Sequence, residues 1–373
     1  MKWLAVLSLC FVTTSIFEAI SQAPSSGVAK APEPTPNETF RAAHKLITPD
    51  GIELENLIKI GGINQFVSIR GRHRSNPILL LLHGGPGFTT LPSSFYYLKD
   101  WEEYFTVVQW DQRGAGKTYL ANDPATVTPT MNINRLVDDA EELTSYLRQT
   151  YGRDRIVLVA HSFGTVVGVK LAQRHPEWFY AYVGMGQLVD FERNESMGYQ
   201  ATLAAARLDR NQQATKDLEG IAPFPDPAHR ERWLQNLSLE RRWLAYYGGY
   251  YWHNNVGSED ALDVFSPDYS SDELKARNVA MGYSMQSLDA ELPSINFRSI
   301  KRFRCPVIFL EGRHDLGTNA TLLDQWYKTL KAPSKQLVWF DDAAHMVYQE
   351  NPGKTLVTLV NSVLPLTHRV AAN

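Results

Sequence analysis

Short, wholly apolar runs alternate with segments of helical periodicity along most of this chain, and this alternation strongly constrains its fold. The apolar runs occupy residues 78–82, 105–110, 156–160, 180–184, 307–310 and 337–340. Helical segments between and after them include 132–152, 163–174, 322–330 and 355–364. Segments that are apolar on both faces are typical of parallel strands buried between two layers of helices. The sequence therefore predicts a doubly wound, mostly parallel α/β sheet, preceded by an antiparallel pair at 54–60 and 65–70.

Residues 187–300 break this alternation. They contain no comparable apolar run, but the stretch "RRWLAYYGGYYWHNN" at 241–255 is densely aromatic. We interpret 187–300 as a mainly helical cap, inserted over the carboxyl edge of the sheet, where open α/β sheets bind their ligands. The core is then expected to comprise 45–186 and 301–368.

The first 44 residues follow a third pattern. A basic start, an apolar run and then small residues predict a secretory signal peptide over 1–21, which places the mature chain in the periplasm or outside the cell. The apolar run is too short to span a bilayer, so no stable membrane anchor is expected. Residues 22–44 are rich in Pro, Ser and Ala and are predicted to be a tether without a packed core. Cys305 would be the single thiol that remains, which excludes an intrachain disulfide.

Composition narrows the classes of partner. The 373 residues include 37 Lys and Arg against 40 Asp and Glu, a net charge of −3 that offers no basic surface for nucleic acid. The stretch "GAGKT" at 114–118 resembles a phosphate loop, but that motif needs a glycine at position 111, where this chain has Asp. The histidines show no spacing typical of a metal site. No cofactor and no metal are expected, and the sequence does not determine the oligomeric state.

Ser162 lies where an apolar run meets a helical segment, within Ala160-His161-Ser162-Phe163-Gly164. A nucleophile elbow places a serine on such a strand-to-helix turn and needs small residues two positions to either side. The usual pattern begins with glycine, so Ala160 adds one methyl group. Ser162 could instead only cap the helix that follows, a role that serine often has.

A serine that carries out acyl transfer also needs a base and an acid, and in this type of fold they follow in the order Ser, acid, His. His345, in a loop before the last helix, is the predicted base. Of the other late histidines, His314 adjoins the acid and would point elsewhere, and His368 lies in the C-terminal tail. Asp315, just after a strand, is the predicted acid, with Asp190 as its competitor.

The stretch "LLHGGPG" at 81–87 has the composition of an oxyanion loop. Its glycines allow a sharp turn after a strand, so that the Gly85 N–H faces the reacting carbonyl; the Phe163 N–H is the second predicted donor. The alternative is a plain Gly/Pro turn. Because this turn, the Ser162 junction and a late loop histidine occur together in the expected order, a nucleophile is favoured over a helix cap.

These motifs resemble those of the α/β-hydrolase superfamily, specifically its proline iminopeptidase-like branch. The resemblance covers most of 45–366 and rests on "HGGPG", "VVQWDQRGAGKT", the Ser162 elbow, "GRHD" and the His345 loop. It implies a serine hydrolase without a cofactor that releases N-terminal proline from peptides through an acyl-enzyme. It also implies that Asp111 and Arg113 hold the site together rather than react.

The resemblance further implies cap carboxylates that hold the free amino terminus of the substrate, because a buried ammonium without partners is costly. The candidates are Asp190, Glu192, Glu195 and Glu240, which could equally be a solvated helix face. The elbow departs from the Gly-Gly-Ser-Trp-Gly that is usual in the branch. The substrate, a small peptide or ester, therefore stays open.

Two other functions are consistent with these motifs. A carboxylesterase or amidase of small apolar acyl groups is the first alternative, and a non-catalytic secreted binding protein on a hydrolase fold is the second. An epoxide hydrolase or a dehalogenase would need a carboxylate at position 162, and the serine excludes both.

Overall fold

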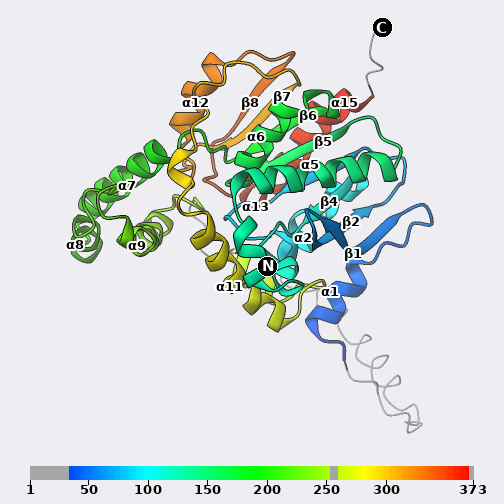
Figure 1. Ribbon diagram of the computed structural model, residues 1–373, viewed down its shortest axis with the longest axis horizontal. Helices are drawn as coiled ribbons and strands as arrows, with labels where there is room; N and C mark the ends of the chain where they lie inside the picture. Colours follow the sequence, from blue (N-terminus) through cyan, green and yellow to red (C-terminus); the bar gives the residue numbers. More distant parts are fainter. Residues whose placement is uncertain (1–32, 253–258, 369–373) are drawn as a thin grey trace, which may run out of the picture. The chain divides into compact units, whose positions relative to one another are not determined.

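The computed structural model describes residues 33–252 and 259–368 (Figure 1). The predicted signal peptide, 1–21, and the first part of the predicted tether lie outside these residues. Contacts divide the chain into the units Met1–Thr35 and Pro36–Asn373, and all the helices and strands described below belong to the second.

One eight-stranded sheet forms the centre of the second unit, in the order β1-β2-β4-β3-β5-β6-β7-β8. The strands are β1 Ile52–Ile60, β2 Ile63–Gly71, β3 Ile78–Leu82, β4 Thr106–Trp110, β5 Ile156–His161, β6 Phe179–Met185, β7 Val307–Gly312 and β8 Lys335–Phe340. β2 pairs antiparallel with both β1 and β4, and from β4 to β8 all neighbours are parallel. The predicted doubly wound, mostly parallel sheet is confirmed.

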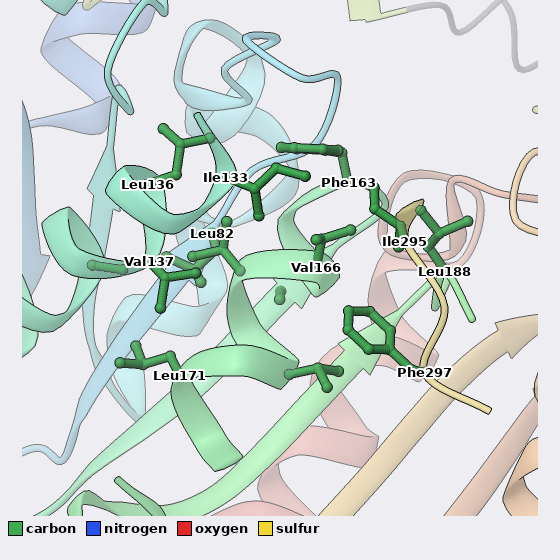
Figure 2. Close-up of a cluster of buried hydrophobic side chains, with 14 of the residues drawn as sticks. Leu82, Ile133, Leu136, Val137, Phe163, Val166, Leu171, Leu188, Ile295 and Phe297 are labelled. Carbon is green, nitrogen blue, oxygen red and sulfur yellow. The ribbon is translucent and has the colours of Figure 1, made fainter. Parts of the chain in front are cut away.

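The central strands are buried because helices cover both faces of the sheet. Alternate residues of a strand point to opposite faces, and here they belong to two different core clusters: Leu80 and Leu158 to one, Leu79 and Val157 to the other. Figure 2 shows part of the first cluster, where side chains of α5 and α6 pack toward Leu82. Burial on both faces explains why these strands are continuous apolar runs in the sequence.

The helices around the sheet fall into two groups. The core helices are α1 Pro36–His44, α2 Leu91–Tyr97, α3 Gly116–Leu120, α4 Pro124–Val127, α5 Ile133–Thr150, α6 Gly164–Arg174, α12 Ala320–Thr329, α13 Val347–Glu350, α14 Pro352–Thr358 and α15 Leu364–Thr367. The helices inserted between β6 and β7 are α7 Phe191–Leu208, α8 Gln212–Glu219, α9 Trp233–Tyr246, α10 Glu259–Asp263 and α11 Ser271–Leu288. Within the described part of 187–300 there is no strand, only an isolated bridge between Asp190 and Asn296. We call this inserted segment the cap.

The last long cap helix, α11, packs on the core. The Ser284 hydroxyl donates a 2.8 Å hydrogen bond to the carbonyl of Gly114 in the loop after β4. The same side chain lies against Gly87, where an added Cβ would be only 2.5 Å from the Ser284 Cβ. One residue of the cap therefore contacts two loops at the carboxyl edge of the sheet.

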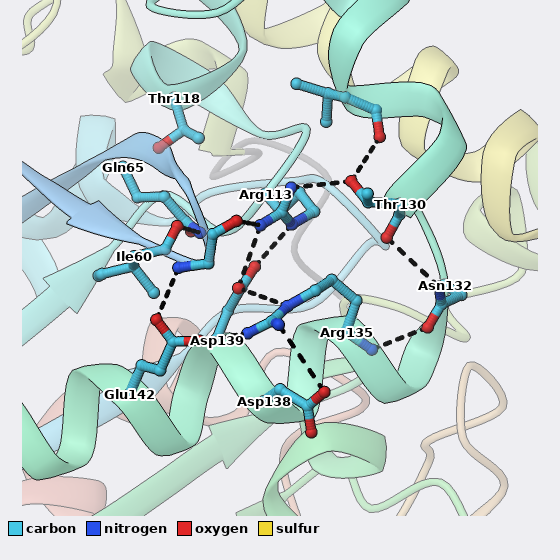
Figure 3. Close-up of polar contacts among 12 residues, drawn as sticks. Ile60, Gln65, Arg113, Thr118, Thr130, Asn132, Arg135, Asp138, Asp139 and Glu142 are labelled. Atoms are coloured by element: carbon cyan, nitrogen blue, oxygen red, sulfur yellow. Dashed lines mark hydrogen bonds and ion pairs between the residues drawn. The ribbon is translucent and has the colours of Figure 1, made fainter.

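A buried ion pair holds the loop after β4 in place (Figure 3). Arg113 Nε lies 2.7 Å from Asp139 Oδ2 on α5, and Arg113 Nη2 donates to the carbonyl of Gly61 in the β1–β2 turn at 2.8 Å. Arg135 contacts the other Asp139 oxygen at 2.8 Å. Because each of the three side-chain nitrogens of Arg113 donates a hydrogen bond, the ion pair holds the loop in a defined conformation.

The predicted tether, 22–44, is wrong for its last nine residues, which form α1. Asn37 and Arg41 stand one turn apart on this helix, and both donate to backbone carbonyls of the cap segment 264–267. The ring of Phe40 lies 5.0 Å from that of Phe95. Composition alone misses such a helix, because its hydrogen-bond partners in the cap are more than 200 residues away in the sequence. Within the described ranges, no helix has the length and apolarity needed to cross a membrane.

Candidate active site

Ser162 lies on a strained turn between β5 and α6. Its φ is 54°, in the left-handed region that non-glycine residues rarely adopt. A Cβ on Gly164 would lie 2.3 Å from the Leu82 carbonyl oxygen, so this position must be glycine for α6 to start so close to β3. This is the geometry of a nucleophile elbow, in which a sharp strand-to-helix turn exposes the serine.

The alanine that replaces the first glycine of the elbow has a specific neighbour. Gly168 on α6 faces it, and a Cβ there would lie 3.0 Å from the Ala160 Cβ and 2.8 Å from Cε2 of Tyr182. The missing side chain at 168 therefore provides the space for the methyl group at 160.

The structure brings His345 and Asp315 together. His345 Nδ1 lies 2.8 Å from Asp315 Oδ2, and Thr318 donates from its backbone N–H to Oδ1 and from its hydroxyl to Oδ2, each at 2.8 Å. Burial by itself would raise the pKa of Asp315, but the nearby His345 and these hydrogen bonds lower it overall. The carboxylate is therefore charged and fixed in orientation. Asp190, the competitor, instead caps α7 by accepting the Arg193 N–H.

Two glycines allow the chain to approach the imidazole of His345. A Cβ on Gly186, whose φ is +53°, would lie 2.8 Å from Cε1 and Nδ1 of the ring. A Cβ on Gly317 would lie 3.1 Å from the ring Cγ. Sequence reasoning missed both residues, although Gly186, two positions after the predicted strand 180–184, was a signal for such a close approach.

The other histidines have different roles. Burial lowers the pKa of His161 to about 3, so its ring is neutral, and its Nε2–H donates to the His345 carbonyl at 3.1 Å. His161 thus holds the loop that carries the base. His314 stacks on Trp252 with ring centroids 3.5 Å apart, and His368 is exposed. Neither histidine lines the cavity that contains Ser162.

The predicted oxyanion donors lie beside Ser162. The loop after β3 approaches the serine so closely that a Cβ on Gly84 would be 2.7 Å from the Ser162 Cβ. Gly85, at φ +108°, and Phe163, at the start of α6, both line the cavity that contains Ser162. Neither amide donates to another group in the described part of the chain, which leaves both available to a ligand.

Ser162, His345, Gly85 and Phe163 line one cavity of about 1430 Å³ beneath the cap. Ser162 and His345 both face it, with no hydrogen bond between them among the described residues. Much of its wall is apolar and includes Phe88, Leu188, Phe191, Leu237, Met285 and Leu292. The cavity is large enough for a ligand of several residues or a bulky acyl group.

Of the four predicted cap carboxylates, the structure brings two together, and Arg241 joins them. Arg241 Nη1 donates to Glu240 Oε2 at 2.6 Å, and its Nη2 donates to Glu195 Oε1 at 2.5 Å. Glu195 and Arg241 line the cavity, and Glu240 is fully buried beside them. The other two candidates are elsewhere: Asp190 faces Arg298 at 3.6 Å, and Glu192 is exposed.

This cluster contains acceptor oxygens without donors. Glu195 Oε2, Glu240 Oε1 and Asn194 Oδ1 are all buried, and none has a hydrogen-bond partner within the described ranges. Burial raises the pKa of Glu240 to about 7, although Arg241 opposes this shift. Asn194 Nδ2 donates to Glu195 and to the carbonyl of Gly317, which links the cluster to the His345 region. Buried acceptors of this kind need a donor that the described residues do not supply, such as a ligand or water.

Sequence reasoning did not select Asn194 or Arg241. Both lie on cap helices whose pattern is that of ordinary amphipathic surface, so only the tertiary arrangement reveals them. No group of three or more His, Cys, Asp or Glu side chains that could hold a metal ion occurs among the residues described.

Comparisons with known proteins agree with this fold. A model of the alpha/beta hydrolase family matches residues 79–359. A protein of Bacillus subtilis named "Probable aminopeptidase YbaC" is 30% identical over 308 residues, which is 81% of this chain and 93% of that protein. A proline iminopeptidase of Saccharolobus solfataricus is 32% identical over 128 residues, which is 33% of this chain and 37% of that protein.

Solved structures show the same fold. A proline iminopeptidase-related protein of Thermus thermophilus superposes with a TM-score of 0.61 at 21% identity, over 84% of this chain and 99% of that one. An epoxide hydrolase of Vigna radiata superposes with a TM-score of 0.52 at 18% identity, over 83% of this chain and 97% of that one. Enzymes with different chemistry thus share this architecture, and the function must be argued from the site itself.

Proposed function

Because this chain belongs to the alpha/beta hydrolase family, we propose that it cleaves acyl bonds with Ser162 as the nucleophile. His345 removes the Ser162 proton, Asp315 stabilises the imidazolium, and the Gly85 and Phe163 amides donate to the oxyanion. Water then releases the acyl-enzyme and restores the serine. The supporting observation is the 2.8 Å contact between His345 and Asp315, facing the same cavity as a serine held at φ 54°.

We propose further that the substrate is a peptide with a free amino terminus. The three unpartnered oxygens of Asn194, Glu195 and Glu240 are acceptors that an ammonium group could satisfy. With Arg241 between them, the two carboxylates leave one net negative charge when both are ionised. The name of the Bacillus subtilis relative supports the same class of substrate. In its narrower form, the proposal is that the amino-terminal residue of this substrate is proline.

The pH dependence of substrate binding follows from Glu240. Its pKa of about 7 means that the carboxyl group becomes charged as the pH rises through neutrality. An ammonium group binds the charged form better. The KM for a free-amine substrate should therefore fall as the pH rises through about 7, as long as the amine itself stays protonated.

An esterase or amidase of apolar acyl groups is the second candidate. It is supported by the apolar wall of the cavity and by Arg241, which already occupies one oxygen of each carboxylate. Such an enzyme would not distinguish a free amine from a blocked one.

The test compares kcat/KM for proline p-nitroanilide with that for its N-acetylated form, with Ser162→Ala as background. A preference for the free amine of tenfold or more, about 1.4 kcal/mol in the transition state, would support the aminopeptidase. Equal rates, or cleavage of p-nitrophenyl esters alone, would support the esterase. A Ser162→Ala variant that folds and keeps full activity would exclude acyl transfer through this serine.

A matched pair of variants tests the amine subsite. Glu195→Gln removes a charge that lines the cavity, whereas Glu192→Gln removes one from the exposed side of the same helix. The first should abolish the preference for the free amine, and the second should leave it intact. Labelling by a fluorophosphonate should remain in both variants, because neither residue belongs to the acyl-transfer machinery.

A further inference from the structure

Glu311 is a buried acid beside the proposed catalytic site that the mechanism above does not use. We propose that it is a positioning residue: its carboxyl group, as a neutral acid, donates a hydrogen bond to Asp315 and so fixes the carboxylate that orients His345. This inference rests on the proposed acyl transfer and adds a fourth group to its machinery.

The position of Glu311 is fixed from two sides. It is the fifth residue of β7 and is fully buried, four positions before Asp315 in the chain. Its Oε2 accepts the backbone N–H of Gln187, which follows β6, at 3.3 Å. The Gln187 side chain is itself held, because it accepts from the Tyr182 hydroxyl at 2.6 Å and donates to the Leu188 carbonyl at 2.7 Å. The carboxyl group of Glu311 therefore has little freedom to turn away.

The Glu311 side chain meets a second carboxyl group. Oε1 has no hydrogen-bond donor among the described residues. The side chain with which Glu311 shares a hydrogen bond is that of Asp315, which has no N–H to donate. Two buried carboxyl groups that share a hydrogen bond cannot both be ionised without a large cost, so one proton lies between them.

The surroundings place that proton on Glu311. Asp315 already accepts from both donors of Thr318 and contacts His345, and all three interactions favour its charged form. Glu311 receives one backbone N–H, and neither Gln187 and Tyr182 on the β6 side nor Trp339, its partner on β8, carries a charge at neutral pH. Burial raises the pKa of Glu311 well above its usual range, and the Asp315 charge raises it further.

This arrangement keeps one negative charge next to His345 instead of two. A second ionised carboxyl group would favour the imidazolium, and the site would then lose its general base at neutral pH. A neutral Glu311 also occupies an Asp315 lone pair, so that the carboxylate keeps the orientation in which Oδ2 meets Nδ1.

Two substitutions of Glu311 separate the effect of its charge from the effect of its hydrogen bonds. Glu311→Gln keeps a donor for Asp315 and an acceptor for the Gln187 N–H, whereas Glu311→Leu keeps the approximate volume and removes both. Asp268→Asn is the matched control, because it removes a carboxyl group of the cap segment that does not line the cavity and whose pKa burial raises to about 7. The readouts are the pH profile of kcat/KM and the pH profile of fluorophosphonate labelling.

We expect Glu311→Gln to label within about twofold of wild type, with the midpoint of its acidic limb unmoved, since no charge is lost. Glu311→Leu should label at least about tenfold more slowly, because Asp315 loses its donor. An acidic limb that moves down by about one pH unit in Glu311→Gln would mean that Glu311 is ionised in the enzyme, and the proposal would be wrong. Full labelling of Glu311→Leu would also overturn it.

Labelling distinguishes this proposal from the one on which it rests. If peptide and ester substrates fail but Ser162 still labels, the substrate assignment is wrong and the Glu311 test remains valid. If wild type does not label at all, acyl transfer through Ser162 fails and the role of Glu311 fails with it. Should Glu311→Leu not fold, as judged by its thermal melt, the acidic limb of Glu311→Gln still decides the protonation state.

Discussion

The imidazole of His345 lies against two backbone positions that carry no side chain, Gly186 and Gly317. Gly186 has a φ of +53°, so any other residue there would be strained and would also contact the ring. This contact makes the position of the base sensitive to a single methyl group.

Gly186→Ala should therefore lower kcat/KM at least tenfold and destabilise the fold by about 1–2 kcal/mol, the usual cost of a left-handed alanine. Gly152→Ala is the matched control, because its φ is +59° but an added Cβ meets nothing within 4 Å. The control should lose similar stability in urea and keep its activity. Equal activity in the two variants would show that contact with the ring does not matter.

At the scale of elements, α11 begins with a complete capping box. The Ser270 side chain accepts the Glu273 N–H at 3.3 Å, and the Glu273 carboxylate accepts the Ser270 N–H at 2.7 Å. The helix carries Ser284, so its stability supports the contact between the cap and the core.

Ser270→Ala should cost about 1 kcal/mol of unfolding free energy, the usual value for a lost helix cap. Ser271→Ala, one residue later and exposed, should cost much less. Urea denaturation measures both, and a similar loss in the two variants would argue against the capping interaction. Activity should be retained in both, because neither serine lines the cavity.

The elements that the sequence predicted correctly are those whose pattern is local. The buried strands are continuous apolar runs, so their ends agree with the structure within two residues. Helix α1 was missed because its partners are distant carbonyls. The segment 355–364 was predicted as one helix, but Leu359–Val363 is a π-helical turn. Pro365, which cannot donate a backbone hydrogen bond, lies two residues after this turn and accounts for the irregularity.

At the scale of the whole molecule, buried acids make stability depend on pH. Burial raises the pKa of Asp268 from 3.8 to about 7. The folded state therefore binds this proton more tightly than the unfolded state, and stability falls as the pH rises between these two values. Three buried histidines have the opposite effect, because their pKa values are lowered and their contribution makes stability rise with pH: His44, His83 and His161.

A difference measurement isolates Asp268 from those histidines. The melting temperature of Asp268→Asn minus that of wild type should increase as the pH rises from about 4 and level off above about 7. The exposed Asp154→Asn variant serves as control and should show a flat difference. A flat difference for Asp268→Asn would mean that its carboxyl group is not perturbed in the folded state.

The residues of the site, like the elements of the fold, differ in whether a local sequence pattern could reveal them. Ser162, Asp315 and His345 could be predicted because each follows a buried strand within a short motif. Glu195 and Glu240 were named as candidates, but Arg241, which joins them, gains its meaning only when two cap helices meet. Contacts of this kind depend on tertiary packing, and a single sequence carries no local pattern for them.

The contact of Ser284 with both Gly114 and Gly87 has a kinetic consequence. If α11 swung outward like a lid, it would break the bond to one loop and remove the support of the other, which also carries Gly85. The loop that is to hold the oxyanion would then loosen each time a substrate entered or a product left. We therefore expect ligands to enter and leave beside the helices α7 to α9, and not through an outward swing of α11.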